Sequence, residues 1–404
     1  MFLLSKKFCL SGGFLFANEY FLLLLQAHNP ARIKNKKNAA NSPLHSCRLP
    51  NFIKIHLLFT NITSTVTRCI AKMKIKKMRT FLKVTLFALV LPIASIAQKK
   101  LSNPAASIEA KALYAYINDM YGKKILSGQQ WASWGIDELK YIHDSTGEDP
   151  AIRGMDFIHD RENTLEVQHA IDWWKSGGIP TIMWHWGAPA IGEGYENSKK
   201  QIDIDKCFQE GTAEYKAFWD ELKKKGDLLE TIQKANVPVL WRPFHELNGD
   251  WFWWGKGGPE KFKKLWITMY DYYVNKRKLN NLIWVLCYTG KPDGAWYPGD
   301  AYVDIAGGDT YARDDNPQTR IYNDVKNIVG TRVPITLHEC GIPPNPDSCI
   351  AKNIMWSWWM EWHTTHLQKL NTTYLRYVYK HEAIITKDEL PDILKVYGTK
   401  NAKM

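Results

Sequence analysis

The chain has 404 residues, 18 of them tryptophan, with 53 Lys and Arg against 41 Asp and Glu and a formal net charge of +12. This length holds one large domain or two ordinary ones. The first 97 residues contain 15 of the Lys and Arg but a single acid, Glu19, so the remaining 307 residues carry 38 basic and 40 acidic side chains. The part expected to fold is nearly neutral, and its charge gives no support to a nucleic acid partner.

Residues 73–97 have the pattern of a secretory signal peptide. The segment MKIKKMRTFLKVTLFALVLPIASIA combines a basic start, a short apolar run and a small-residue cleavage site that ends at Ala97. Its apolar run is too short for a comfortable membrane span. Residues 1–72 lie upstream of this complete signal, and they are either a mis-called extension, with the true start at Met73 or Met78, or a genuine long presequence.

We therefore expect residues 98–404 to form the mature chain, a catalytic domain that is exported to the periplasm or secreted. No lipid-anchoring cysteine follows the signal, so we expect no membrane anchor, and we expect a monomer. Four cysteines remain in this part, too few for a disulfide scaffold. Cys340 and Cys349 bracket a short loop that one bridge could close, and free thiols are the alternative, whereas Cys287 lies in an apolar run typical of a buried position.

Eight short runs rich in β-branched and aromatic residues, each bounded by turn-forming residues, predict strands. In chain order they are Lys123–Gln130, Pro150–Phe157, Ile179–Trp186, Val237–Glu246, Asn281–Thr289, Tyr302–Tyr311, Val333–Gly341 and Ile354–Trp362.

Segments with apolar residues at helical spacing separate these runs, among them Thr212–Ala235 and Pro259–Lys278. Eight strands that alternate with helices over about 300 residues predict an α/β fold, a single (β/α)8 TIM barrel. The alternative is a doubly wound open sheet, which would need a Gly-rich phosphate turn after its first strand. The segment SGQQWASW does not supply one.

Polar residues gather where the predicted strands end, the face on which barrels of this kind place their active sites. They are His185, His245, Glu246, Asp309, Tyr311, His338, Glu339 and Trp362. One such residue is ordinary, because a local hydrogen bond explains it, but this many at one end favour a functional site. Asp309 and Asn248 are typical of structural hydrogen bonding rather than of ligand binding.

Glu246 and Glu339 end the fourth and seventh strands, which places them across the barrel mouth from each other. Paired carboxyl groups in an aromatic cleft are what glycoside hydrolysis requires, one as a proton donor and one as a nucleophile. The stretch WRPFHELNGDWFWWG, which contains Glu246, supplies flat indole faces on which sugars can pack. A metal hydrolase is the weaker reading because the first strand has no H-x-H pair, and we expect neither a metal nor a cofactor.

The same motifs resemble glycoside hydrolase family 26, the endo-β-1,4-mannanase family of clan A. WRPFHELNGDWFWWG resembles the acid/base signature of that family, and VPITLHECGIPPNPDS resembles its nucleophile strand. MWSWWMEWH and YKHEAIITKDELPDI resemble its eighth strand and closing helix, so the likeness covers residues 101–395. The one departure is Leu247, where the family commonly has Met, and we expect it to change packing only.

The resemblance implies a role for each matching residue. Glu246 would be the general acid/base and Glu339 the nucleophile of a retaining, double-displacement reaction. The implied substrate-binding residues are His185, His245, Trp251, Tyr311, Trp362 and Arg242. Among them Tyr311 would hydrogen-bond the nucleophile, and Arg242 has two equal interpretations, direct substrate contact or pairing with Glu339.

The resemblance also implies a polysaccharide substrate, with β-1,4-linked mannan, glucomannan or galactomannan the first expectation. The family includes enzymes that act on β-1,3-xylan and on mixed-linkage β-glucan, so these substrates stay open. Exo rather than endo action also stays open, because it depends on loops such as Ile191–Lys200. A non-catalytic glycan-capture protein is a hypothesis of another class, because it would use the same tryptophans without needing both glutamates.

Overall fold

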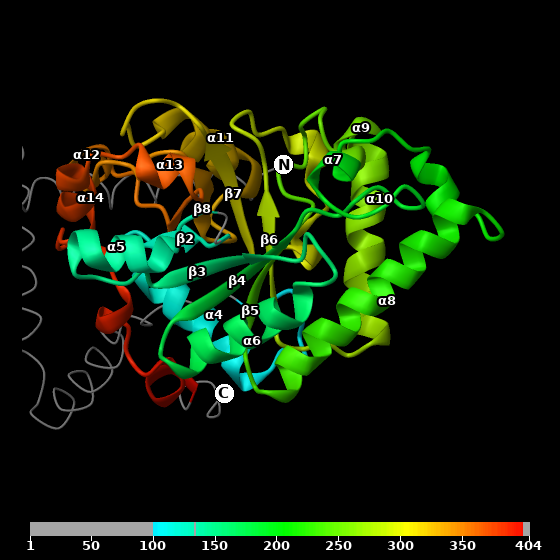
Figure 1. Ribbon diagram of the computed structural model, residues 1–404, viewed down its shortest axis with the longest axis horizontal. Helices are drawn as coiled ribbons and strands as arrows, with labels where there is room; N and C mark the ends of the chain where they lie inside the picture. Colours follow the sequence, from blue (N-terminus) through cyan, green and yellow to red (C-terminus); the bar gives the residue numbers. More distant parts are fainter. Residues whose placement is uncertain (1–99, 133–134, 399–404) are drawn as a thin grey trace, which may run out of the picture. The chain divides into compact units, whose positions relative to one another are not determined.

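The computed structural model describes residues 100–132 and 135–398, and its centre is a closed barrel of eight parallel strands in the order β2-β3-β4-β5-β6-β7-β8-β9 (Figure 1). The strands are β2 (Gly128–Gln130), β3 (Ile152–Asp156), β4 (Ile179–Trp184), β5 (Val239–Pro243), β6 (Leu282–Cys287), β7 (Ile305–Thr310), β8 (Ile335–Cys340) and β9 (Trp359–Glu361). The barrel closes where Gln129 of β2 pairs with Glu361 of β9. The single (β/α)8 barrel is thereby confirmed, and the open sheet is excluded.

Helices connect the strands and cover the outside of the barrel. The longer ones are α4 (Ile108–Met120), α5 (Glu138–Thr146), α6 (Asn163–Lys175), α8 (Ala213–Lys234), α10 (Pro259–Tyr270), α11 (Thr319–Val329), α12 (Pro346–Lys352) and α14 (Thr372–Tyr379). Short helical turns are α7 (Tyr195–Ser198), α9 (Trp253–Lys256), α13 (Thr365–Gln368), η2 (Ile204–Phe208), η3 (Asp271–Lys276), η4 (Gly294–Trp296), η5 (Asp300–Tyr302), η6 (Lys387–Glu389) and η7 (Leu394–Gly398). The predicted helix Thr212–Ala235 matches α8, whose first turn is capped by the side chain of Thr212.

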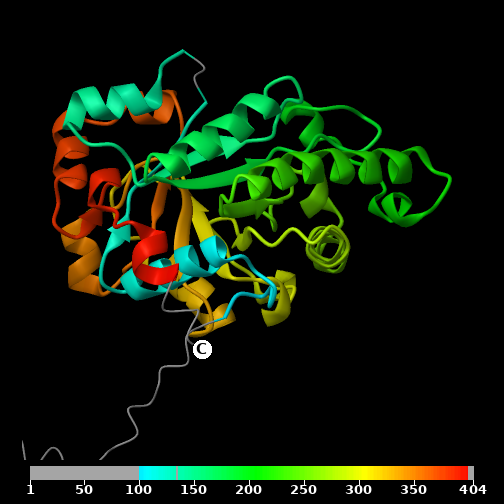
Figure 2. The same ribbon diagram turned by 90° about the horizontal axis from the view of Figure 1, so that it is seen from below.

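The period-two pattern of the strands separates an inner from an outer apolar layer. Along β6, Ile283, Val285 and Cys287 face inward and share a cluster with residues of α4. The alternate β6 residues pack outward against the surrounding helices. Helix α4 therefore closes the amino-terminal end of the barrel, beside the turn η7, as Figure 2 shows from below.

The first predicted strand, Lys123–Gln130, is divided in the structure. Its first part, β1 (Ile125–Leu126), leaves the barrel and pairs in parallel with β10 (Ile384–Ile385). The Ser127 hydroxyl donates to the Ile385 carbonyl and accepts from the Ala151 amide, which fixes the break. The last predicted strand is likewise shortened to Trp359–Glu361.

Two expectations about the mature chain are answered within the described residues. Cys207, Cys287, Cys340 and Cys349 are all free and buried, so the loop bridge between Cys340 and Cys349 is not formed. Among the residues described, no helix has both the length and the apolar character needed to cross a membrane. Residues 1–97, interpreted as an extension and a signal peptide, lie outside the described part.

Candidate active site

A cleft of about 500 Å³ opens at the carboxyl ends of the strands. Its lining residues are Gln130, Trp131, Ala132, Asp156, Ile158, Glu162, Glu166, His185, Tyr195, His245, Glu246, Phe252, Tyr311, Glu339, Trp362, His363 and His366. The volume falls within the usual range for ligand sites, and the lining mixes aromatic surface with a few convergent polar groups. The cleft holds both predicted glutamates.

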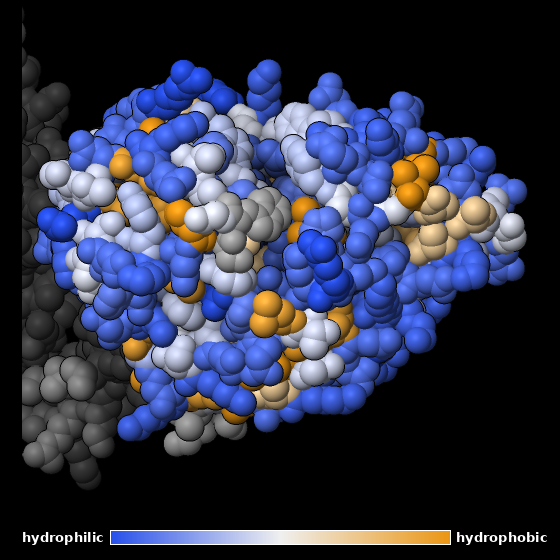
Figure 3. All heavy atoms as spheres, in the orientation of Figure 1, coloured by the Kyte–Doolittle hydropathy of each residue, from blue (hydrophilic) through white to orange (hydrophobic). Residues whose placement is uncertain are grey.

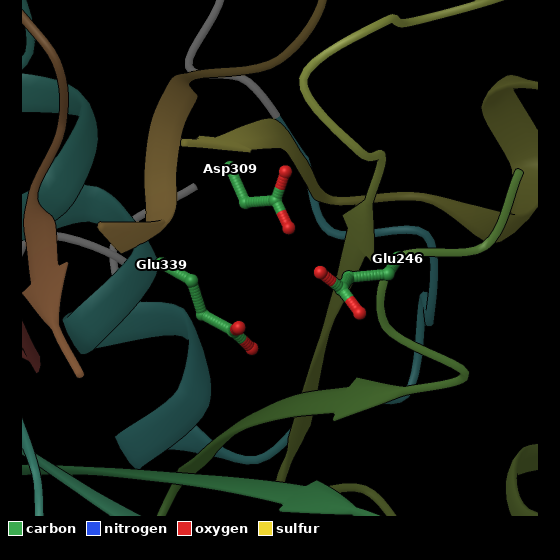
Figure 4. Close-up of side chains that lie close together, drawn as sticks. All are labelled: Glu246, Asp309 and Glu339. Atoms are coloured by element: carbon green, nitrogen blue, oxygen red, sulfur yellow. The ribbon is translucent and has the colours of Figure 1, made fainter. Parts of the chain in front are cut away.

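The carboxyl groups of Glu246 and Glu339 point toward each other across the cleft, with Asp309 beside them (Figure 4). One oxygen from each of the three residues lies within 4.8 Å of the others. Retaining glycosidases have carboxyl groups about 5–5.5 Å apart, whereas inverting enzymes separate them by about 6.5–9.5 Å to admit a water. An approach of the two carboxyl oxygens to within 4.8 Å agrees with the shorter separation of the retaining class.

Glu246 reaches the cleft through an unusual turn at the end of β5. Phe244 and Glu246 have φ of 52° and 50°, in the left-handed region that costs a non-glycine residue about 1–2 kcal/mol. The turn is held because the amide of Leu247 donates to the carbonyl of Cys287 at 3.0 Å. His245 and Glu246 both line the cleft as a result, although adjacent strand residues normally face opposite ways. Leu247 is fully buried, which agrees with a packing role.

A β-bulge directs Glu339 into the cleft. The pairing of β7 with β8 runs from Gly308↔Leu337 to Asp309↔Glu339 and skips His338. A bulge of this kind inserts one residue and redirects the side chains that follow. His338 itself is fully buried, with its Nε2 at 2.8 Å from the Tyr288 carbonyl.

Arg242 lies inside the barrel, beneath the cleft, and is fully buried. Its guanidinium donates to the His338 carbonyl at 2.8 Å and to Gln130 Oε1 at 3.0 Å, and Nη1 lies 3.7 Å from Glu339 Oε1. It does not line the cleft. Of its two interpretations, this position favours pairing with Glu339 over contact with substrate.

The surroundings of Glu339 set the charge of the site. Burial and the neighbouring Glu246 raise the pKa of Glu339 to about 8, against the opposing effects of Arg242, His185 and Tyr311. The Tyr311 hydroxyl donates to Glu339 Oε2 at 3.0 Å, the hydrogen bond that the resemblance implied. At neutral pH the free cleft therefore keeps a proton on its carboxyl groups.

Asp309 is the third carboxyl of the cluster, and its Oδ2 has no partner among the described residues. Burial, followed by the hydrogen bond with Glu246 and then its charge, raises its pKa well above the usual range. The three oxygen donors could hold either shared protons or a hard cation such as Ca²⁺ or Mg²⁺.

His185 and His245 lie side by side in the cleft, with ring centroids 4.3 Å apart. Burial alone would lower the pKa of His185. The hydrogen bond between its Nδ1 and Asp156, together with the charges of Asp156 and the two glutamates, outweighs burial and raises the pKa. Burial and the charge of His185 lower the pKa of His245 well below its usual range. The pair therefore consists of a charged His185 and a neutral His245.

The tryptophans around the site divide into a rim and a core. Trp251 is 37% exposed, and its Nε1 donates to Glu246 Oε2 at 2.6 Å. Trp362 lines the cleft near His185, with ring centroids 6.2 Å apart. Trp253, Trp254, Trp358 and Trp359 are fully buried and belong to the core.

Several lining residues were missed from the sequence, including Trp131, Asp156, Glu166, Tyr195 and His363. Asp156 ends β3 within the segment Pro150–Phe157, so the rule that found the other strand ends could have found it. The rest lie on loops and helices, where strand periodicity carries no signal.

Comparison with known proteins gives a consistent result. The model of the family "Glycosyl hydrolase family 26" matches residues 102–389. A mannan endo-1,4-beta-mannosidase of Thermothelomyces thermophilus is 34% identical over 72% of this chain and 63% of its own length. Mannan endo-1,4-beta-mannosidase B of a Piromyces species is 35% identical over 72% of this chain and 53% of its own length. The chain thus spans less than two thirds of these curated relatives.

Solved structures resemble the barrel as well. A beta-mannanase from a symbiotic protist of the termite Reticulitermes speratus, complexed with gluco-manno-oligosaccharide, is 33% identical with a TM-score of 0.67, covering 72% of this chain and 98% of that one. GH26A from Muricauda is also 33% identical, with a TM-score of 0.66, covering 72% of this chain and 99% of that one.

Proposed function

The chain belongs to glycosyl hydrolase family 26, and from this premise we propose that it is a retaining, endo-acting glycoside hydrolase that cleaves β-1,4-mannosidic bonds in mannan, glucomannan or galactomannan. The observation that carries the proposal is the approach of Glu246 and Glu339 within 4.8 Å in an aromatic cleft. A capture protein would need the aromatic surface but not this pair.

In the first step, Glu339 attacks the anomeric carbon while the bond from that carbon to the leaving oxygen breaks. Glu246 gives its proton to that oxygen, so the leaving chain departs as a neutral alcohol. Arg242, His185 and Tyr311 all favour the anion of Glu339, against burial and the neighbouring Glu246, which raise its pKa to about 8. The reactive state is the one in which Glu339 is ionised and Glu246 holds the proton.

In the second step, Glu246 accepts a proton from water, and the oxygen of that water attacks the anomeric carbon. The ester bond to Glu339 breaks, and both carboxyl groups return to their starting states. Esterification removes the negative charge of Glu339, so Glu246 no longer faces a second carboxylate when it acts as the base. Two inversions give net retention of the β configuration.

We assign substrate contacts to the side chains that border this pair. Trp362 and Trp251 offer indole faces on the two sides of the bond that breaks, and His185 and His245 offer ring nitrogens to the sugar at the cleavage point. Arg242 supports Glu339 from below instead of touching the sugar.

The preference for mannan rests on the relatives, because curated and solved proteins similar to this chain are named as mannanases. β-1,3-xylan and mixed-linkage β-glucan are the alternatives that the test includes. The pattern of residues 73–97 supports export, and we propose a monomer without a nucleic acid partner. Sequencing the amino terminus of the exported protein and light scattering in solution test these two points.

The direct experiment expresses residues 98–404 and measures reducing-sugar release from galactomannan, glucomannan, β-1,3-xylan and mixed-linkage β-glucan. We expect release from the mannans that is abolished in Glu339→Ala and retained in Glu260→Ala, a matched change at a side chain that is 84% exposed on α10. Binding without release from any substrate would support the capture protein instead.

A further inference from the structure

A second recess opens beside the cleft, on the side of Tyr311. It has a volume of about 560 Å³ and lies between segments 311–313, 341–342 and 366–370, which follow β7, β8 and β9. Tyr311 and His366 line both this recess and the cleft, and their rings lie 5.1 Å apart. The recess therefore adjoins the cleft and is large enough for a sugar-sized group.

Every ionisable side chain that lines this recess, apart from Tyr311, is basic. Arg313, His366 and Lys369 contribute to the wall, and no described carboxylate does. Arg313 and Lys369 are exposed, and no ion pair or side-chain hydrogen bond joins either of them to a described residue. Asp314 and Asp315, which follow Arg313, accept hydrogen bonds from Asn316 and Asn345 instead.

In two other recesses of the described chain, the lysines have polar partners. In the recess beside segment 187–192, Lys225 is paired with Asp160 at 2.6 Å. In the recess beside η2, Lys261 is paired with Asp205 at 2.9 Å, and Lys256 donates to the Lys199 carbonyl at 2.6 Å. We name the recess of Arg313, His366 and Lys369 the basic recess, because Arg313 and Lys369 have neither an ion pair nor a side-chain hydrogen bond to a described residue.

We propose that the basic recess binds a carboxylate carried by a side group of the polysaccharide, so that the protein prefers an acidic, uronate-bearing chain over a neutral one. The inference rests on the proposed function, because the main chain must lie in the cleft for its side group to enter the recess. Arg313 can bind a carboxylate in a two-pronged arrangement, and Lys369 adds a point charge. Gly341 leaves space beside the two shared residues, because a Cβ at this position would lie 3.2 Å from His366 Nδ1 and 3.3 Å from Tyr311 Cδ1.

The test compares guar galactomannan with the same polymer after oxidation of C6 of its galactose side groups to carboxylates. The ratio of kcat/KM for the acidic over the neutral polymer is measured for the wild type and for Arg313→Gln/Lys369→Gln. We expect the ratio to fall about fivefold in the double variant at low salt, and to fall in the wild type as NaCl is added. Lys111→Gln, an exposed cation on α4 at the far end of the barrel, is the matched control and should leave the ratio unchanged.

The two proposals fail in different ways. If the wild type hydrolyses neither polymer, the proposed function is wrong. If the wild type hydrolyses both polymers, but the ratio of kcat/KM for the acidic over the neutral polymer is the same in the wild type and the double variant, the basic recess does not bind the carboxylate. The inference is then overturned. Arg313→Lys/Lys369→Arg keeps both charges and should restore the ratio; a failure to restore it would also count against recognition of a carboxylate by charge.

Discussion

The Tyr311 hydroxyl donates a 3.0 Å hydrogen bond to Glu339, from the end of β7 to the end of β8. This bond favours the ionised form of a carboxyl group whose pKa burial and Glu246 together raise to about 8. Attack on the sugar requires the ionised form, so this one contact affects both the rate and its dependence on pH.

Tyr311→Phe should lower kcat/KM by about tenfold and move the acidic limb of its pH profile upward by about one unit. The removed hydroxyl lowers the pKa of Glu339, so its loss raises that pKa, and more alkaline solution is needed to ionise the nucleophile. A profile measured from pH 4 to 9 on soluble mannan tests this. An acidic limb that stays in place would show that the bond does not act on Glu339.

Arg242→Lys should lower kcat by about ten- to a hundredfold while KM changes little. Arg242 is fully buried and lies 3.7 Å from Glu339, so it acts on the nucleophile and not on the bound sugar. Steady-state kinetics separate the two quantities. A large rise in KM at constant kcat would instead assign Arg242 to substrate binding.

Glu246→Ala should lower kcat by about 10²–10⁴ on polysaccharide, but by much less on an aryl β-mannoside whose leaving group needs no proton. Added azide should restore turnover by attacking the glycosyl-enzyme from the side that Glu246 vacates. Equal losses on both substrates, without rescue, would contradict its role as general acid/base.

Removal of metal ions should leave activity unchanged. Glu246, Asp309 and Glu339 converge within 4.8 Å, but the proposed double displacement uses the two glutamates as acid/base and nucleophile and needs no metal. Prolonged dialysis against EDTA, followed by assay in metal-free buffer, checks this expectation. Loss of activity that Ca²⁺ or Mg²⁺ restores would reassign the cluster as a cation site.

Glu361 predicts a dependence of stability on pH. It is fully buried on β9 with neither carboxylate oxygen bonded to a described residue, and burial raises its pKa well above the usual range. Because the pKa is higher in the folded state than in the unfolded state, stability is lost as pH rises from about 4 toward the folded pKa. Glu361→Gln cannot ionise and escapes this loss.

Thermal unfolding of the wild type and Glu361→Gln at pH 4 and pH 8 measures the effect. The Tm difference, variant minus wild type, should be larger at pH 8 by several degrees, since each unit of pKa shift is worth about 1.4 kcal/mol. Glu260→Gln, at an exposed position on α10, should show no such change with pH. Equal differences at both pH values would show that Glu361 has a partner when it is ionised.

Much of the fold followed from periodicity and turn residues, because strands buried on both faces and helices with one apolar face leave different patterns. All eight barrel strands lie within the predicted segments. The break at Ser127 was not predictable, since it depends on β10, which lies more than 250 residues farther along the chain. The sequence shows the apolar run of the first predicted strand, but it does not show which distant segment pairs with it.

The site was predictable where it lies at strand ends and not where the backbone departs from regular geometry. Alternation would turn His245 and Glu246 to opposite faces, but left-handed turns at Phe244 and Glu246 bring both into the cleft. The bulge beside His338 likewise redirects Glu339. Local composition does not reveal either departure, because neighbouring strands impose both.

In the proposed double displacement, Glu339 forms a covalent intermediate with the sugar. Proton NMR of the first product released from mannohexaose, recorded before mutarotation, reports whether this intermediate forms. We expect the β-anomer to appear first and then to equilibrate. An initial α-anomer would mean a single inversion, and it would contradict the assignment of Glu339 as the nucleophile.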